Sequence, residues 1–117
     1  MTSKQALFTS TVETSTGWDC YRDIYTGNNE RYCVYSYTAS PQRYDNKCIY
    51  EFINFILHVV APTGDNLIAK MRKLKKDLQA AGFTYPSEMP AGDEEGQDII
   101  LECSIWDAVP YEEESDG

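Results

Sequence analysis

The sequence predicts a single small α+β domain, in which a mostly antiparallel sheet of about four strands packs against one main helix and a short N-terminal helix. Three observations lead to this prediction: a central apolar run with period-two alternation, a segment of helical periodicity after it, and a second alternating segment near the end. A chain of 117 residues suits one core. We place the domain at residues 1–109 and expect 110–117 to form an acidic, flexible C-terminal tail.

The first predicted element is a short helix over Ser3–Ser15. Ser3 is a suitable N-cap, because its hydroxyl can accept a hydrogen bond from a free backbone N–H of the first turn. Three apolar residues give the helix a thin stripe, and they are Leu7, Phe8 and Val12. The segment Thr14–Gly17 is expected to end it.

A hairpin and a loop are predicted next. The segments Trp18–Tyr25 and Arg31–Ala39 are rich in aromatic and β-branched residues, and they flank a Thr-Gly-Asn-Asn turn cluster. We therefore expect the two segments to pair as a hairpin. Proline, aspartate and asparagine in Ser40–Asn46 favour a loop.

The most apolar stretch, Lys47–Val60, is interpreted as a long strand. Its odd positions form one apolar face that only Glu51 interrupts, and they are Ile49, Ile53, Phe55, Leu57 and Val59. The even positions are mixed, which suits a face partly covered by a helix or by a neighbour. Periodicity leaves a helix open as the competing interpretation, but the abundance of Ile, Val, Phe and Tyr favours a strand.

A helix is predicted after the turn Pro62–Gly64, with Asp65 or Asn66 as its N-cap and Gly82 as its left-handed C-terminal cap. Its apolar residues recur at helical spacing, and they are Leu67, Ile68, Met71, Leu74 and Leu78. Its outer face carries Lys70, Arg72, Lys73, Lys75 and Lys76. This basic face is solvated, binds phosphate or contacts an acidic neighbour, and the acidic last third of the chain favours the acidic neighbour over phosphate.

The last part of the chain is predicted to be a mobile loop over Thr84–Gly96 followed by a strand over Asp98–Asp107. One face of this strand is apolar, with Ile99, Leu101, Cys103 and Ile105. Because neither alternating segment could bury its apolar face alone, we expect both strands to lie in one sheet. Pro110 should stop the last strand.

The sequence lacks the residue combinations that catalysis requires. His58, the single histidine, lies inside the apolar run, so no Ser-His or Cys-His pair can be proposed. The glycines form no phosphate-binding motif, and the four cysteines are too far apart to indicate a zinc site. We predict that the protein is not an enzyme and uses no cofactor or metal. The thiols are expected to be free in a reducing compartment, with a disulfide left open.

Charge is distributed unevenly along the chain. The formal net charge is −9, yet all ten Lys and Arg residues precede Gly82, and eleven of the nineteen acidic residues follow Phe83. Such asymmetry favours head-to-tail contact between copies or a basic partner, unless the acidic residues mark only a solvated loop and tail. The N-terminal residues contain no apolar run of a signal peptide, and Ile53–Val60 is too short to span a bilayer.

The order of several features carries a resemblance to a known family. These features are an early segment Gly17–Asn28, the strand Arg31–Ala39, the motif Tyr-Asp-Asn-Lys at 44–47, the long strand Cys48–Val60, a helix ending in Ala-Ala-Gly-Phe at 80–83, and an acidic loop before the strand Asp98–Trp106. The chain resembles the tail-terminator and tail-completion proteins of siphophages, also described as tail-to-head joining proteins. The resemblance covers Gly17–Asp107.

The resemblance implies a structural virion protein that forms a hexameric ring at the head-proximal end of the tail. Such a ring would stop the growth of the tail tube protein and then dock onto the head connector or stopper protein, with DNA only as passing cargo in its lumen. The implied location is the phage tail or neck of the virion, after assembly in the host cytoplasm. An uneven charge distribution agrees with this, because subunits of a ring make heterologous contacts between unlike surfaces.

We expect the interface residues to be aromatic residues, the turn before the long strand, the basic helix and the acidic loop. The candidates are Tyr35, Tyr37, Tyr44, Asp45, Lys73, Lys76, Glu94, Glu95 and Trp106. Two other hypotheses stay open. One is a small acidic DNA mimic that inhibits a nuclease or restriction system, and the other is a small-molecule binder, for which no convergent polar cluster can be named.

Overall fold

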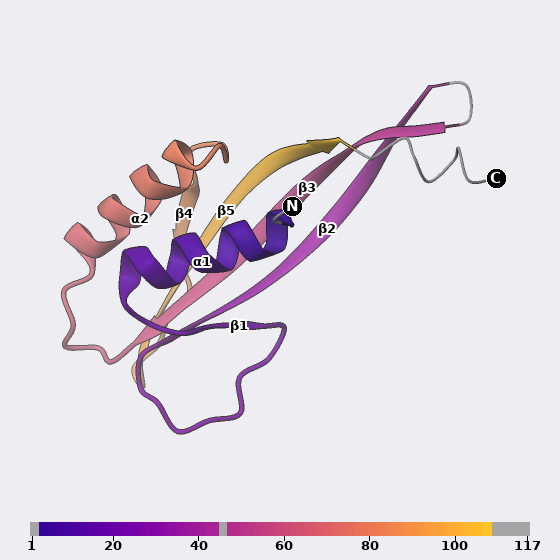
Figure 1. The fold of residues 1–117 in the computed structure, drawn as a ribbon. Coiled ribbons are helices and arrows are strands. Elements are labelled where there is room, and N and C mark those ends of the chain that lie inside the picture. The colour runs from indigo at the N-terminus through magenta and orange to yellow at the C-terminus, as the bar shows by residue number, and fades with distance from the viewer. Residues whose placement is uncertain (1–2, 45–46, 109–117) are drawn as a thin grey trace.

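The computed structural model describes residues 3–44 and 47–108. Two helices and five strands follow one another along the chain (Figure 1). In order, they are α1 (Lys4–Thr16), β1 (Cys20–Arg22), β2 (Tyr32–Tyr44), β3 (Lys47–Ala61), α2 (Ile68–Ala80), β4 (Ser87–Pro90) and β5 (Gln97–Ala108).

The strands form one mixed sheet in the order β1-β2-β3-β5-β4. Only the β1–β2 pair is parallel, and the other pairs are antiparallel. Both helices lie on the same side of the sheet, and the long β2–β3 hairpin extends past their ends (Figure 1). The predicted α+β domain is confirmed, with five strands in place of about four.

The core lies between the two helices and the odd-numbered positions of the sheet. Phe8 of α1 stacks on Phe55 of β3 with ring centroids 4.4 Å apart, and Phe83 meets both rings edge-on. Helix α2 buries Met71, Leu74 and Leu78 on the same side. The predicted apolar faces of the two long strands are confirmed, since Phe55 and Leu57 are fully buried, and Leu57 lies opposite the buried Leu101 of β5.

The predicted hairpin between Trp18–Tyr25 and Arg31–Ala39 is wrong. β1 runs parallel to β2, with Cys20 opposite Cys33 and Arg22 opposite Tyr35. The turn cluster belongs to a longer loop that begins at Asp23, which has a positive φ of 66°, and that returns the chain to the start of β1. The sequence did not reveal the parallel pairing, because turn-forming residues mark where a strand ends and do not show whether the next strand runs parallel or antiparallel to it.

The predicted loop over Ser40–Asn46 is also wrong as far as the structure describes it. β2 continues to Tyr44, and Pro41 lies opposite Glu51 inside the ladder, next to an irregularity at Gln42 and Arg43. Proline is tolerated here because β1 pairs only with Cys33–Tyr35, which leaves this part of β2 at the edge of the sheet.

A short strand replaces part of the loop predicted over Thr84–Gly96. β4 pairs with β5 from Ser87 opposite Glu102 to Pro90 opposite Ile99, and all four of its residues are exposed. β4 is thus a short edge strand that ends in proline, and the Pro and acidic residues that indicated a loop are the ones that natural edge strands carry.

Cap geometry defines both helices. The predicted N-cap Ser3 is confirmed, because its hydroxyl accepts a hydrogen bond from Ala6 N. The expected cap at Asp65 or Asn66 is wrong: the N-cap of α2 is Leu67, while Asn66 Oδ1 accepts a bond from Ile68 N just outside it. At the other end, Gly82 has a φ of 109°, and Phe83 N donates to Leu78 O, so the predicted left-handed glycine cap is confirmed.

Candidate interaction surfaces

The sheet has one face that neither helix covers, and we call it the open face (Figure 1). It carries the even-numbered side chains of β3 and β5 and the side chains that lie opposite them on the neighbouring strands. Its apolar and aromatic members are Tyr21, Tyr32, Val34, Tyr50, Phe52, Ile56, Val60, Met89, Ile100, Trp106 and Ala108. Of these, Trp106 is 55% exposed and Met89 is 61% exposed, so the open face presents large apolar side chains to its surroundings.

Aromatic clusters lie at both ends of the open face. At one end the ring of Tyr25 lies 4.6 Å from that of Tyr21 and 4.2 Å from that of Tyr32. At the other end, the ring centroid of Trp106 lies 4.8 Å from that of Phe52 and 6.5 Å from that of Tyr50. Clustered aromatic side chains of this kind are enriched in protein interfaces, because they offer much contact area with few rotatable bonds.

The middle of the open face is polar and acidic. Asn54 links two strands, since its Nδ2 donates to Glu102 at 2.8 Å and its Oδ1 accepts from Ser104 Oγ at 2.7 Å. His58 Nδ1 lies 3.0 Å from Asp98. Among the described strand residues on this face, Arg43 is the one cation, and it lies opposite Cys48 next to the irregularity of β2.

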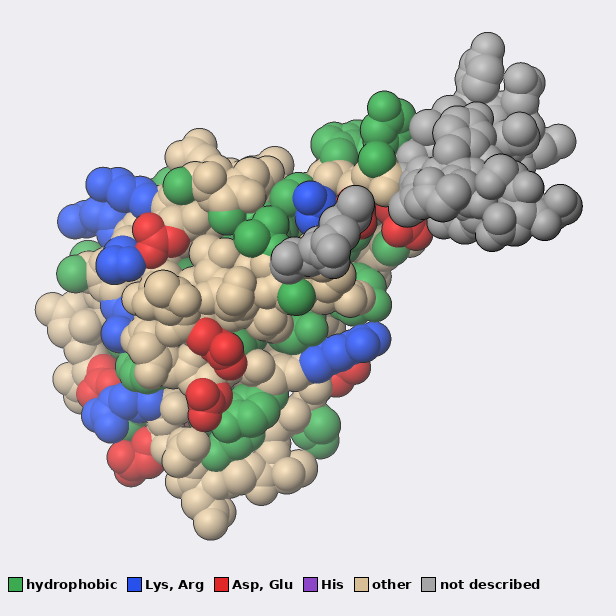
Figure 2. Space-filling model, viewed as in Figure 1, with side chains coloured by type: hydrophobic (Ala, Val, Ile, Leu, Met, Phe, Trp, Pro, Cys, Tyr) green, Lys and Arg blue, Asp and Glu red, His purple; other side chains and the backbone are tan. Residues whose placement is uncertain are grey.

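Five of the ten Lys and Arg residues lie on α2, on the other side of the sheet, and further cations lie elsewhere on the surface (Figure 2). Three of them have partners in the chain: Lys70 donates to Thr16 O at 2.6 Å, Lys73 pairs with Asp77 at 2.6 Å, and Lys75 pairs with Glu88 of β4 at 2.6 Å. The expected acidic neighbour of the basic helix is therefore present in part within the same chain. Among the described residues, Arg72 and Lys76 have no ion-pair partner.

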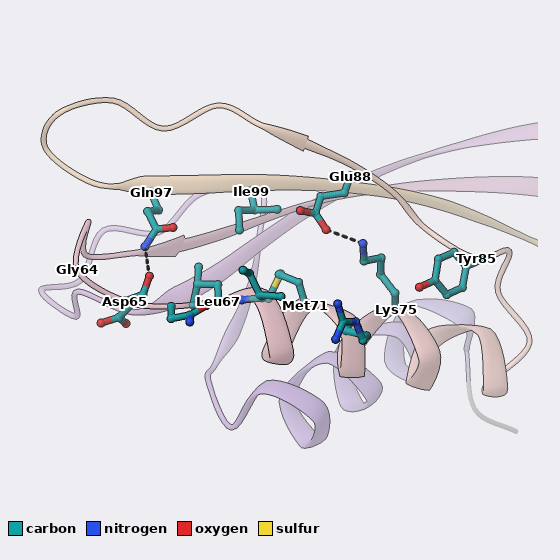
Figure 3. A pocket seen from close by; sticks show the side chains of 12 residues that line it. Gly64, Asp65, Leu67, Met71, Lys75, Tyr85, Glu88, Gln97 and Ile99 are labelled. Carbon is teal, nitrogen blue, oxygen red and sulfur yellow. Dashed lines mark hydrogen bonds and ion pairs between the residues drawn. The ribbon is translucent and has the colours of Figure 1, made fainter.

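A groove of about 560 Å³ lies between α2 and the β4–β5 pair (Figure 3). Leu67, Met71 and Ile99 line it with apolar atoms. Two large apolar side chains of the groove are exposed, Ile68 at 66% and Tyr85 at 49%. The Lys75–Glu88 ion pair spans it, and Gln97 closes one end by donating to the carbonyl oxygens of Pro62 and Asp65.

The nine candidate interface residues have different positions in the structure. Tyr35 is only 6% exposed and belongs to the core, so its assignment to a surface is wrong. Tyr37 is half-buried, with the Arg22 guanidinium 5.1 Å from its ring centroid. Trp106 is exposed on the open face, as its candidate role requires.

The other candidates are spread over three places. Lys73 and Lys76 are exposed on α2, and Glu94 and Glu95 are exposed in the turn before β5. The backbone of Tyr44 pairs with that of Lys47 at the end of the hairpin, and Asp45 lies outside the described residues. The structure therefore does not join these residues in one patch.

Sequence reasoning missed several exposed residues that the structure brings together. Phe52 lies beside Trp106, and Ile68 and Tyr85 lie at one groove. The alternation of β3 already assigned Phe52 to the even face, so that signal was present in the sequence. No sequence signal could place Tyr85 beside α2, because that contact depends on the unpredicted strand β4.

Burial keeps the three described cysteine thiols in their unreactive, protonated form. Burial raises the pKa of the Cys33 and Cys103 thiols to about 12 and raises that of Cys20 further, so these thiols stay protonated at neutral pH. Within residues 3–44 and 47–108, no group of three or more His, Cys, Asp and Glu side chains could hold a metal ion. In the same ranges, no helix is long and apolar enough to cross a membrane.

Comparison with known proteins supports the fold. No family model and no curated protein matches the sequence. Among six matching chains of solved structures, one has a TM-score of 0.56 and 12% sequence identity, and the match covers 92% of this chain and 96% of that chain. The name of that protein describes no function. At this identity the likeness shows a shared fold only.

Proposed function

We propose that the protein is a structural subunit of a siphophage tail, a tail-terminator or tail-completion protein that forms a hexameric ring and joins the tail tube to the head connector. The observation that carries the proposal is the open face, because a large apolar and aromatic surface without a covering helix is typical of a subunit that assembles. That the assembly is a hexameric tail ring is what the sequence resemblance implies.

Two unlike surfaces support a ring in particular. The open face is aromatic and, in its middle, acidic, whereas five of the ten Lys and Arg residues lie on α2, on the opposite side of the sheet (Figure 2). A contact between the open face of one copy and the α2 side of the next is heterologous, and heterologous contacts close into rings when the rotation between neighbours permits. Charge complementarity would orient such a contact.

The long hairpin adds a second kind of surface. β2 and β3 extend together beyond both helices, so the far end of the hairpin is positioned to reach a neighbouring copy or another ring (Figure 1). A subunit that must join two different partners, the tail tube and the head connector, needs surfaces outside its ring contacts. The hairpin meets that need.

Native mass spectrometry tests the assembly, with the oligomeric state of the wild type compared with that of Trp106→Glu. We expect six copies for the wild type and a shift to smaller species for the variant, because a carboxylate at the centre of an aromatic contact is costly to desolvate. Ala6→Glu is the matched control, since it adds the same charge at an exposed position of α1, outside the open face, α2 and the groove.

Added tail tube protein tests the role in the tail. Wild type should cap polymerised tubes at one end and limit their length in electron micrographs. A protein that stays monomeric and instead binds a nuclease tightly would contradict the proposal and support the DNA-mimic hypothesis.

A further inference from the structure

We propose that the groove between α2 and the β4–β5 pair binds the segment Val109–Glu114 of a neighbouring copy of this chain. This inference rests on the proposed assembly of several copies and names one contact within it. The three steps that lead to it concern the chemistry of the groove, the chemistry of the segment and the distance between them.

The groove combines apolar and basic groups. The buried Leu67 and Met71 and the exposed Tyr85 line it (Figure 3). Ile68, a second large and exposed side chain, also lines it. Arg72 lines the same groove and has no ion-pair partner among the described residues. The groove therefore suits a segment that has both an apolar part and an acidic part.

The apolar and basic residues of this part of α2 lie in a row along the helix. Ile68, Arg72 and Lys76 are spaced by four residues and so lie along one side of the helix. Lys75 adds a further positive charge, although it is already paired with Glu88. The expected ligand is thus an extended segment whose apolar residues lie near Ile68 and whose carboxylates lie near Arg72 and Lys76.

The C-terminal sequence has this composition. Val109, Pro110 and Tyr111 are followed at once by Glu112, Glu113 and Glu114. Tyrosine can pack against Ile68 and Tyr85 and keep its hydroxyl in water. Three successive carboxylates supply the negative charge that Arg72 and Lys76 lack among the described residues.

Distance favours binding between copies. β5 places Ala108 opposite Tyr50, whereas Ile99 lies opposite Val59 beside the groove. Along β5, Ala108 and Ile99 are about 30 Å apart at a rise of about 3.4 Å per residue. Tyr111 can extend at most about 11 Å beyond Ala108. The apolar part of the segment therefore cannot reach the Ile68 end of its own groove.

The same geometry agrees with the ring contact. Trp106 of the open face lies two residues before Ala108, the last described residue, so the segment is joined to the described chain close to an exposed aromatic cluster. If that cluster contacts the α2 side of the next copy, the segment starts close to the neighbour's groove. The groove and the open face then belong to one continuous interface.

Isotope-mixed crosslinking of the full chain tests the contact. Equal amounts of ¹⁴N- and ¹⁵N-labelled protein are assembled together and treated with a carbodiimide, which couples carboxylates to nearby lysine amines. We expect crosslinks from Glu112–Glu114 to Lys75 or Lys76 that contain one light and one heavy peptide. The Lys75–Glu88 pair, at 2.6 Å within one chain, is the internal control and should give same-isotope crosslinks.

Charge reversal and rescue give a second measurement. Arg72→Glu combined with Lys76→Glu should weaken association in sedimentation about tenfold, as the loss of a few exposed ion pairs implies. Reversal of Glu112, Glu113 and Glu114 to Lys should weaken it similarly, and the combination of both sets should restore it. Ala6→Glu on α1 is the control for a carboxylate added outside the proposed contact.

The outcomes separate this inference from the proposed function. A ring that forms with no crosslink to the segment, or with same-isotope crosslinks only, overturns the docking of the segment between copies and leaves the ring intact. Failure of the combined variant to recover association also overturns it. A wild type that stays monomeric contradicts the ring itself.

Discussion

Both faces of the sheet carry large apolar side chains, but the helices cover only one of them. On β3, the odd positions Phe55, Leu57 and Val59 are fully buried under the helices, while their even neighbours remain partly exposed. The even positions include Phe52 and Ile56, which are as apolar as those in the core. Two helices of 13 residues cover one face of this sheet. The difference supports the proposal that the second face contacts another copy of the chain.

The polar groups sharpen this comparison. On the helix side, and within the residues that the structure describes, one buried side-chain polar atom, the Ser15 hydroxyl of α1, makes no hydrogen bond of standard geometry, and it lies near the Asp77 carboxylate of α2, whose pKa it helps to lower. On the open face, Asn54, Ser104 and Glu102 form a connected hydrogen-bond network across two strands. A pre-formed polar network inside an apolar surface can enter an interface with its hydrogen bonds already made, which lowers the cost of desolvation.

The largest expected effect comes from a carboxylate placed on each face of β5. Leu101→Asp puts an unpaired carboxylate where the native side chain is 1% exposed, and this should cost several kcal/mol and unfold the domain. Ile100→Asp, one residue away on the open face, should keep the fold. Circular dichroism and thermal melting of both variants measure the difference. Equal melting temperatures would show that the two faces do not differ in burial as described.

A second pair of variants compares aromatic residues on β3. Phe55→Ala removes a ring that stacks on Phe8 at 4.4 Å and should lower the free energy of unfolding by about 3 to 5 kcal/mol. Phe52→Ala removes a ring from the open face and should cost clearly less, while it weakens self-association. Urea denaturation gives the first quantity and sedimentation velocity the second. A Phe52→Ala variant as unstable as Phe55→Ala would mean that the open face is part of the folding core.

The sequence predicted the covered face well, for a physical reason. Burial on one side of a strand imposes a period of two, and the positions Phe55, Leu57, Leu101 and Cys103 follow it. The Ser3 and Gly82 caps were also predictable, because each depends on local backbone geometry. These elements are determined by residues close to them in the chain.

The rest of the fold depends on contacts that local patterns do not encode. The parallel pairing of β1, the strand β4 and the continuation of β2 through Pro41 follow from which strands lie at the edge of the sheet. Tyr35 was assigned to a surface because tyrosine suits both interfaces and cores, and its register opposite Leu57 places it in the core. The groove could not be predicted, since it is bounded by β4.

The smallest expected effect concerns charge on the α2 side, and it asks whether the two sides of the molecule meet between copies. From sequence alone, reversing both Lys73 and Lys76 to Glu should weaken assembly and spare the fold. The structure separates the two residues. Lys73 pairs with Asp77 one turn further along the helix. Lys73→Glu therefore creates a like-charge pair, which should destabilise α2 by about 0.3 kcal/mol.

Lys76 has no such partner among the described residues, and Lys76→Glu should therefore leave thermal stability unchanged and weaken assembly. A single exposed pair is worth only about 0.2 to 1 kcal/mol, but a closed ring repeats the contact at every interface, and the effects add. High salt should reduce the difference between Lys76→Glu and wild type, because it screens exposed charges. Sedimentation velocity at low and high salt measures this, with helix content as the control for folding. If Lys76→Glu assembles like wild type at low salt, charge on α2 does not contribute to the ring, and the aromatic contacts of the open face must hold it.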